Sequence, residues 1–340
     1  MTGASDDAES RSVTIYDIAA AAGVATSTVS RTFTRPGRVS AKTAAKVRAV
    51  AEELGYKSSP RPVTADHPAT RLLAMMVADI ANPFYATLVR GAQLTAAEAG
   101  YEIVLLDTRE SGRRERTALD RILPVVDGVA VASSRMPDNA LRTIAKQIPL
   151  VVINRELRGT VSVLSDNVGG TQSAIRHLRA AGHESVTYVG GPEASWNDGV
   201  RSRAVRDFAQ SLGMRTTRIG PFLPTIEGGW TAGTQLAEQP PSAVIAFNDL
   251  MAIGIVQGLK ANRVEVPRDV SVIGYDDIPA GRLCTPALTT IAIPARTLGS
   301  TAVTNLVALI RGARPGGEGN LVLSTKLIVR QSTGRVRPLF

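Results

Sequence analysis

The sequence predicts a small N-terminal domain of three helices that contains a helix-turn-helix, followed by an α/β body of two doubly wound lobes. Two observations support this fold class. Residues 11–57 combine three short helical patterns with many basic side chains. Beyond residue 71, short apolar segments alternate with amphipathic stretches, as in βαβ units. A chain of 340 residues suffices for two or three domains of ~100–200 residues each.

Positive charge is concentrated near the N-terminus. The chain has 39 basic and 30 acidic side chains, a formal net charge of +9. Residues 11–62 hold nine basic and three acidic side chains, which gives +6 and leaves +3 for the rest. This distribution is typical of a DNA-binding module attached to a neutral body, although a solvated basic surface is the alternative.

Three short helices are expected in this basic region. The first begins at the N-cap Thr14 and ends at Gly23. The second covers about residues 26–33, and the third begins after the N-cap Ser40 and ends before Gly55. Two short helices joined through a glycine turn form a helix-turn-helix.

The second helix of such a motif lies in the major groove, where its polar residues meet base edges. We expect Thr26, Ser27 and Arg31 to read bases, and Arg31 can donate two hydrogen bonds to one guanine. Helix N-termini suit phosphates, which fix position without reading sequence. The expected backbone contacts are Thr14, Tyr16, Arg38, Ser40, Lys42 and Thr43. The alternative is a three-helix surface whose polar residues are simply solvated.

Residues 58–70 are predicted to form a linker, because they contain three prolines and two serines. In the body, residues 71–340, eight apolar segments are predicted strands: 72–78, 103–107, 125–131, 150–153, 161–164, 186–189, 244–247 and 270–275. One connection between consecutive strands, residues 154–160, contains no helix, and it divides the eight strands into two groups of four. We therefore expect lobe 1 at about residues 71–160 and 294–318, and lobe 2 at about 161–291 and 320–336. Ligands of such lobes bind at the carboxyl ends of the strands, in the cleft.

The expected ligand contacts are polar residues that follow strands, two aromatic residues and one further arginine. Paired donors and acceptors suit a polyhydroxylated molecule, aromatic faces stack on sugar rings, and a guanidinium binds hydroxyls or a carboxylate. Each polar residue taken alone is better explained as a helix cap or loop residue, and Phe84 is equally well explained as part of the core. The residues are Asp79, Phe84, Asn154, Arg155, Trp196, Arg201, Asn248 and Asp276.

The sequence shows no motif of a known catalytic, cofactor or metal site. We therefore expect no catalytic residue, no cofactor and no metal, and we interpret His177 and His183 as structural. A single cysteine, Cys284, excludes an internal disulfide and fits a reducing cytosol. No segment approaches the ~18 apolar residues of a membrane helix, and the first ten residues lack a signal-peptide pattern. A cytoplasmic protein without a membrane partner is expected.

Several motifs together identify a family. In the basic region they are residues 13–19 (VTIYDIA), 22–24 (AGV), 28–31 (TVSR), 39–43 (VSAKT) and 54–56 (LGY). In the body they are residues 79–84 (DIANPF), 182–183 (GH), 190–192 (GGP), 247–249 (FND), 274–277 (GYDD) and 288–291 (LTTI). With these motifs the chain resembles the lactose-repressor (LacI/GalR-type) family of bacterial transcription regulators over about residues 13–334.

The resemblance implies a periplasmic-binding-protein-like body and a repressor, associated with the nucleoid, that binds a pseudo-palindromic operator in double-stranded DNA as a homodimer. It also implies a small-molecule effector in the cleft, a sugar or sugar derivative, that controls DNA binding allosterically. It assigns base contacts to Thr26, Ser27 and Arg31, and effector contacts to Arg201, Asn248 and Asp276. A nucleobase or a small acid paired with Arg201 is an alternative effector.

Three departures from the family pattern matter. The hinge of relatives carries an Ala-Arg-x-Leu pattern, where residues 62–65 read PVTA; Val63 is the only apolar substitute and Ala65 a poor wedge. Ala25 replaces a serine N-cap, at a cost on the order of 1 kcal/mol for the second helix. No leucine heptads follow residues 329–333, so a dimer rather than a tetramer is expected.

Three other classes of protein are alternatives to this interpretation. A secreted sugar-binding protein would share the body but would need a signal peptide and would have no use for residues 13–56. A sugar-processing enzyme would need a catalytic constellation or a phosphate loop. A regulator of the same shape that answers to a protein partner would bind no small molecule.

Overall fold

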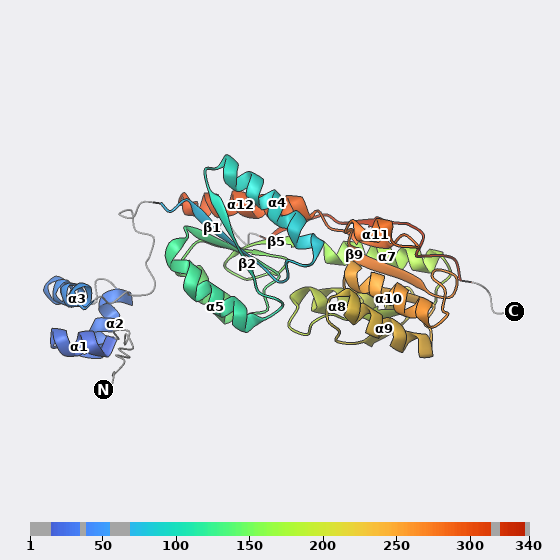
Figure 1. Ribbon diagram of the computed structural model, residues 1–340, viewed down its shortest axis with the longest axis horizontal. Helices are drawn as coiled ribbons and strands as arrows, with labels where there is room; N and C mark the ends of the chain where they lie inside the picture. Colours follow the sequence, from blue (N-terminus) through green and yellow to red (C-terminus); the bar gives the residue numbers. More distant parts are fainter. Residues whose placement is uncertain (1–14, 35–38, 55–68, 314–319, 337–340) are drawn as a thin grey trace, which may run out of the picture. The chain divides into compact units, whose positions relative to one another are not determined.

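The computed structural model describes residues 15–34, 39–54, 69–313 and 320–336. Its contacts divide the chain into two compact units, residues 1–61 and 62–340 (Figure 1). The predicted residues Thr14, Arg38, Val63 and Ala65 lie outside the described residues.

The N-terminal unit consists of three helices, as predicted: α1 (Ile15–Ala22), α2 (Thr26–Thr34) and α3 (Ala41–Glu53). Gly23 joins the first two with a φ of 62°, a conformation that glycine adopts without steric cost. Ser40 caps α3, and its side chain accepts a hydrogen bond from the Thr43 backbone amide at 3.2 Å. The shared core contains Ile18, Ala22, Val29, Val47 and Ala51.

Lobe 1 of the body is built on a parallel six-stranded sheet in the order β11-β5-β4-β3-β1-β2. Its strands are β1 (Leu72–Val77), β2 (Glu102–Asp107), β3 (Gly128–Ala132), β4 (Leu150–Ile153), β5 (Val161–Ser165) and β11 (Asn320–Leu323). Its helices are α4 (Pro83–Glu98), α5 (Gly112–Ile122), the 3-10 helix η1 (Leu123–Val125), α6 (Asp138–Ala145) and α12 (Ala295–Ile310). Figure 1 shows α12 beside α4, against which it packs.

Lobe 2 has a second six-stranded sheet, in the order β12-β10-β9-β8-β6-β7, in which only β12 is antiparallel to its neighbour. Its strands are β6 (Ser185–Val189), β7 (Arg215–Ile219), β8 (Ala243–Ala246), β9 (Ser271–Asp276), β10 (Thr289–Ala292) and β12 (Lys326–Ile328). Its helices are α7 (Asn167–Ala180), α8 (Trp196–Ser211), α9 (Ile226–Glu238), α10 (Asp249–Ala261) and α11 (Ala280–Leu283).

The expected lobe boundary at residues 160–161 is wrong. Strand β5 belongs to lobe 1, because it pairs in parallel with β4, and Val151 lies opposite Val161. Strand β11, expected in lobe 2, pairs with the outer side of β5. In the described residues the chain therefore crosses between the lobes three times, after β5, after β10 and after β11. These crossings bring the carboxyl ends of the two sheets toward one another.

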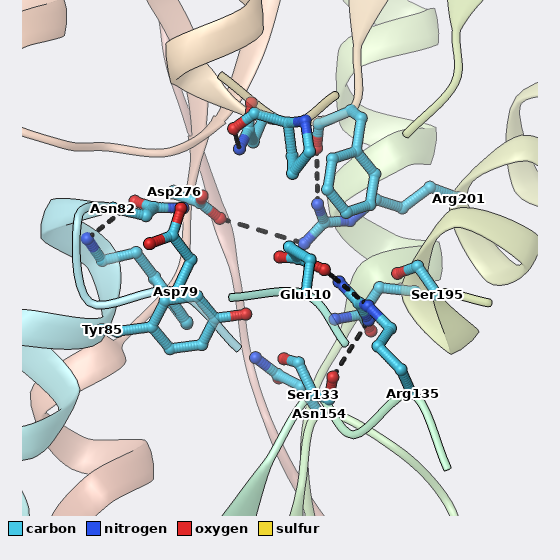
Figure 2. Close-up of a pocket in the computed structure, with 15 residues that line it drawn as sticks. Asp79, Asn82, Tyr85, Glu110, Ser133, Arg135, Asn154, Ser195, Arg201 and Asp276 are labelled. Atoms are coloured by element: carbon cyan, nitrogen blue, oxygen red, sulfur yellow. Dashed lines mark hydrogen bonds and ion pairs between the residues drawn. The ribbon is translucent and has the colours of Figure 1, made fainter. Parts of the chain in front are cut away.

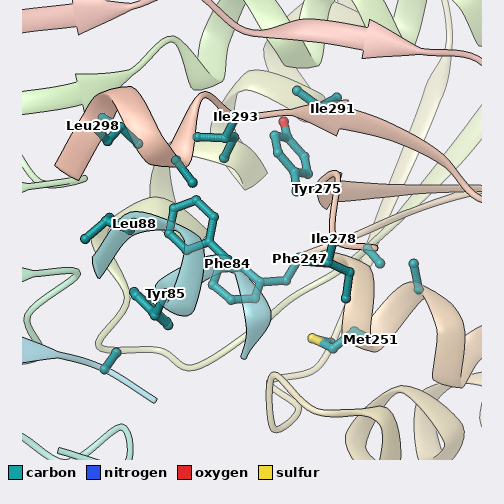
Figure 3. Packing of buried hydrophobic residues seen from close by; sticks show 14 of the residues in the cluster. Phe84, Tyr85, Leu88, Phe247, Met251, Tyr275, Ile278, Ile291, Ile293 and Leu298 are labelled. Carbon is teal, nitrogen blue, oxygen red and sulfur yellow. The ribbon is translucent and has the colours of Figure 1, made fainter. Parts of the chain in front are cut away.

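A single apolar cluster continues from lobe 1 into lobe 2 (Figure 3). It includes Phe84 at the start of α4, Phe247 after β8 and Tyr275 in β9, all buried. Phe84 is thus a core residue that also lines the cavity described next, and its contact with a ligand stays a prediction.

Candidate ligand-binding cleft and nucleic-acid interface

A cavity lies between the carboxyl ends of the strands of the two lobes (Figure 2). The space between its lining atoms is about 430 Å³, which includes space open to solvent. Residues that follow β1, β2, β3 and β4 line it from lobe 1, and residues at the ends of β6, β7, β8 and β9 line it from lobe 2. They are Asp79, Asn82, Phe84, Tyr85, Glu110, Ser133, Arg135, Asn154, Ser195, Asn197, Arg201, Pro224, Phe247, Asn248 and Asp276.

Arg201 is held in the cavity wall by several contacts within the protein. It projects from α8 and is 3% exposed. Its Nε donates to Asn167 Oδ1 at 2.8 Å, and one of its terminal nitrogens donates to the carbonyl oxygen of Phe247 at 2.6 Å. The guanidinium also lies 4.0 Å from the centre of the Tyr275 ring. These contacts fix the plane of the guanidinium before any ligand binds.

Asp276, at the end of β9, faces this guanidinium with a nitrogen–oxygen distance of 4.0 Å. Burial raises the pKa of Asp276 to about 7, although Arg201 and a hydrogen bond with Asn82 lower it. Its φ of 109° lies in the left-handed region, which is costly for a residue with a side chain. A carboxyl group held in this way can accept or donate a hydrogen bond near neutral pH.

Lobe 1 supplies a second charged pair, which the sequence analysis missed. A terminal nitrogen of Arg135 lies 2.5 Å from Glu110 Oε2, and its Nε donates to the same oxygen at 2.6 Å. Arg135 also donates to the Ser133 carbonyl oxygen at 3.0 Å. Burial raises the pKa of Glu110, and Arg135 partly offsets this effect. Both residues follow strands, so the signal that identified Asp79 could also have found them.

The asparagines of the cavity are already engaged within the protein. Asn248 caps α10 by accepting from the Met251 amide at 2.9 Å, and it donates to the Pro224 carbonyl oxygen at 3.0 Å. Asn154 accepts from Ser165 at 3.0 Å. The expectation that Asn248 is a helix cap is therefore met, while the amide also lies at the cavity wall.

Backbone strain is concentrated at this cavity. Of the eight non-glycine residues with positive φ in the described part of the chain, four line it: Glu110, Ser133, Asn154 and Asp276. Such conformations cost about 1–3 kcal/mol each, and they are retained where the surrounding structure requires a particular side-chain direction. The strain therefore favours this cavity as the candidate functional site.

Six of the eight expected ligand contacts line the cavity: Asp79, Phe84, Asn154, Arg201, Asn248 and Asp276. The structure places Arg155 and Trp196 elsewhere. Arg155 turns back into lobe 1, where it donates to the carbonyl oxygen of Met136 at 2.5 Å and to Asp138 at 2.6 Å. Trp196 is half-buried in the first turn of α8, while the residues on either side of it reach the cavity.

In the N-terminal unit, α2 presents the expected base-reading residues outward. Ser27 and Arg31 are exposed and Thr26 is half-buried, while Val29 is turned into the core. Among the expected backbone contacts, Tyr16 is 70% exposed and Lys42 is exposed at the start of α3. The remaining two, Ser40 and Thr43, share a hydrogen bond of 2.8 Å.

Two of the histidines serve the packing of lobe 2. His177 Nε2 lies 2.9 Å from the Thr333 hydroxyl, and His183 Nε2 lies 3.1 Å from that of Ser271. Within the described ranges, no three histidine, cysteine or acidic side chains are arranged to hold a metal ion. None of the helices in that part of the chain combines the length and apolar character needed to cross a membrane.

Known proteins share these features. Residues 14–59 match the model of bacterial regulatory proteins of the lacI family, and residues 175–333 match a periplasmic binding protein-like domain. The HTH-type transcriptional repressor CytR of Escherichia coli strain K12 is 32% identical over 330 residues, which cover 94% of this chain and 96% of CytR.

Solved structures agree. The Lac repressor dimer bound to operator and the anti-inducer ONPF has a TM-score of 0.69 and 25% identity, covering 95% of this chain and 100% of that one. A LacI family regulator from Enterococcus faecalis V583 with bound ribose has a TM-score of 0.70 and 28% identity, covering 78% and 100%. A helix-turn-helix unit, a two-lobed body and near full-length similarity to repressors lead to one assignment: this chain belongs to the LacI family of bacterial regulatory proteins, which are transcription regulators rather than enzymes.

Proposed function

We propose that this protein is a transcriptional repressor that binds a pseudo-palindromic operator as a dimer and is controlled by a sugar or sugar derivative in the cleft. The observation that carries the proposal is the cavity itself, where polar side chains from the strand ends of both lobes surround a prearranged guanidinium. A ligand that contacts both lobes favours one angle between them, and so can change the affinity for DNA. Such a regulator acts in the cytoplasm, at the nucleoid.

A neutral polyhydroxylated effector fits the cavity best. The guanidiniums of Arg135 and Arg201 already have protein partners. The cavity therefore presents a balanced set of donors and acceptors rather than an uncompensated positive charge. The ribose-bound relative supports this class. A small acid remains the competing class, because Arg201 is within reach of a ligand carboxylate.

A thermal-shift panel of pentoses, hexoses, disaccharides, nucleosides and small carboxylic acids tests the effector class. At a concentration of 100 Kd, a ligand stabilises the folded protein by about 2.7 kcal/mol. We expect a sugar to raise the Tm of the wild type and to have little effect on Arg201→Lys, because an ammonium cannot make the two fixed contacts of the guanidinium. A response to carboxylic acids alone would contradict the sugar assignment.

Selection of genomic DNA fragments by the purified protein tests operator binding. We expect the wild type to recover an inverted repeat and Arg31→Ala to recover a relaxed version of it. Recovery of unselective DNA by the wild type would contradict a sequence-reading repressor.

The dimer needs a self-complementary face, and α9 offers one. Leu223, Ile226 and Trp230 are 67%, 36% and 45% exposed, and the last two are one helical turn apart. Exposed apolar side chains gathered in this way mark interaction surfaces. We assign this face to contact with a second copy, because an isologous dimer uses the same patch on both subunits.

A further inference from the structure

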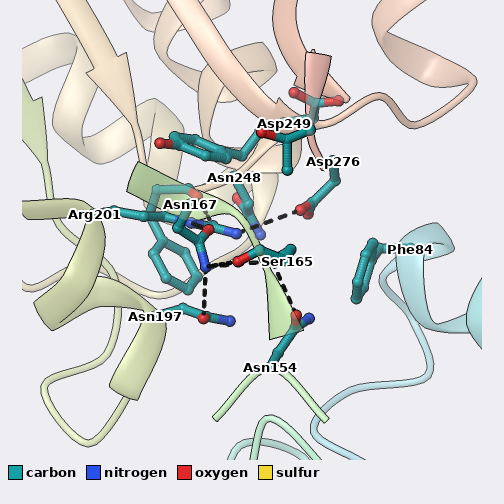
Figure 4. Close-up of polar contacts among 12 residues, drawn as sticks. Phe84, Asn154, Ser165, Asn167, Asn197, Arg201, Asn248, Asp249 and Asp276 are labelled. Carbon is teal, nitrogen blue, oxygen red and sulfur yellow. Dashed lines mark hydrogen bonds and ion pairs between the residues drawn. The ribbon is translucent and has the colours of Figure 1, made fainter. Parts of the chain in front are cut away.

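A buried hydrogen-bond chain passes beneath the cavity at one of the crossings between the lobes (Figure 4). The polypeptide leaves the lobe 1 sheet at Ser165 and enters α7 of lobe 2 at Asn167. Asn167 is 2% exposed and does not line the cavity. Asn167 can therefore affect a ligand in the cavity only through the residues that it contacts.

Both the oxygen and the nitrogen of the Asn167 amide form hydrogen bonds. Its oxygen accepts from Arg201 Nε at 2.8 Å, and its nitrogen lies 3.2 Å from Asn197 Oδ1. Both partners are cavity residues of lobe 2. The same nitrogen lies 3.3 Å from the Ser165 hydroxyl, which donates to Asn154 Oδ1 at 3.0 Å. Asn154 is a cavity residue of lobe 1.

We propose that Asn167 is a positioning residue that joins the effector-contacting side chains of lobe 2 to those of lobe 1, so that a ligand in the cleft sets the angle between the lobes. This proposal rests on the proposed role of the cleft as the effector site. A ligand that bonds to Asn154 or Arg201 in place of their present partners changes this network. The members of the network are all buried and orient one another. The Asn167 amide at this crossing thus couples ligand binding to movement of the lobes.

The first test follows the orientation of Arg201 by NMR of its Nε–H group in the full-length protein. We expect slow solvent exchange in the wild type and exchange about 10-fold faster or more in Asn167→Ala, because the hydrogen bond to a charged donor is lost. Asn167→Asp keeps the accepting oxygen, so slow exchange should persist, as it should in Ser165→Ala. Slow exchange in Asn167→Ala would overturn the positioning role.

The second test measures the lobe-to-lobe distance by electron spin resonance between labels at positions 109 and 193, which are exposed and lie in different lobes. Cys284 is replaced by serine, and labelled subunits are diluted with unlabelled ones so that only distances within one chain are read. We expect a broader distribution in Ser165→Ala, Asn167→Asp and Asn167→Ala than in the wild type. Ser165→Ala removes the hydroxyl that donates to Asn154, and the two Asn167 variants remove the amide nitrogen that reaches this hydroxyl.

Thr108→Val is the matched control, because the Thr108 hydroxyl is also buried but donates to the Val77 carbonyl oxygen within lobe 1. Its distribution should match that of the wild type. Wild-type distributions in all three crossing variants, or equal broadening in Thr108→Val, would overturn the proposal. Neither test needs operator or effector, so failure here leaves the proposed repressor function standing, and the reverse also holds.

Discussion

Asp276 titrates in an environment very different from that of an exposed aspartate. Because its pKa is raised from 3.8 to about 7, the folded state holds this proton more tightly than the unfolded state. Its contribution to stability is complete below pH 3.8 and is lost as the pH rises to about 7, with a slope of at most ~1.4 kcal/mol per pH unit for one proton.

Asp276→Asn removes this contribution. We expect the stability difference between wild type and variant, measured by urea unfolding, to shift against the wild type between pH 4.5 and 8. Asp120→Asn, at an exposed carboxylate of α5, serves as the control. A constant difference across this range would contradict the placement of the titration.

Arg31 and Lys42 are expected to divide the work of DNA binding. Arg31→Ala should cost about 1–3 kcal/mol at one base position and relax specificity there, because a bidentate base contact is lost. Lys42→Ala should weaken binding to all sequences and reduce the salt slope by about 1. Titration of operator and mutated operator at two salt concentrations measures both effects. Identical behaviour of the two variants would refute this division.

Helices α9 and α10 approach so closely that their backbones touch through glycines. A Cβ at Gly229 would lie 2.2 Å from the Met251 carbonyl oxygen. The two helices carry Pro224 and Asn248 of the cavity at their N-terminal ends, so their spacing also sets the lobe 2 wall. We expect Gly229→Ala to destabilise the fold by about 1–3 kcal/mol through overpacking, measured as a fall in Tm.

Gly199→Ala provides the matched control, since this helical glycine of α8 has no atom within 4 Å of an added Cβ. It should stabilise the protein by up to ~1 kcal/mol, because alanine has the higher helix propensity. Equal destabilisation by both substitutions would show that the contact between α9 and α10 is not responsible.

At this scale, sequence and structure agree where periodicity is strong. The three N-terminal helices and most buried central strands follow from apolar spacing and capping residues, but the buried strand β10, which contains two threonines, was not predicted. The mixed polar pattern of β7 and the short β11 and β12 gave no such signal, because edge strands are only partly buried. The sheet to which β5 belongs is decided by a pairing that no local pattern records.

The same limit applies to the cavity. Position after a strand identified Asp79, Asn154, Asn248 and Asp276, because the fold brings all such ends together. It could not decide the direction of each side chain. Arg155 was misplaced because the carbonyl groups of the loop after β3 capture its guanidinium, an interaction between segments distant in sequence.

For the whole molecule, the assigned dimer face on α9 gives a direct prediction. Trp230→Glu should dissociate the dimer in sedimentation velocity and weaken operator binding, because two charges would face each other across the two-fold axis and half-sites would be bound singly. Val125→Glu, at a 48% exposed apolar side chain of lobe 1, should leave both unchanged. An intact dimer in Trp230→Glu would place the interface elsewhere.

The three crossings also determine the order in which the body can be completed during synthesis. Residues 72–165 supply five strands of lobe 1, but α12, which packs on β3, β4, β5 and α4, and the edge strand β11 come from residues 295–323. Lobe 1 therefore lacks the helix that covers β3, β4 and β5 until almost all of lobe 2 has been translated. A stop codon just before α12 would leave both sheet face and edge bare, so truncated chains should aggregate rather than persist as a folded single lobe.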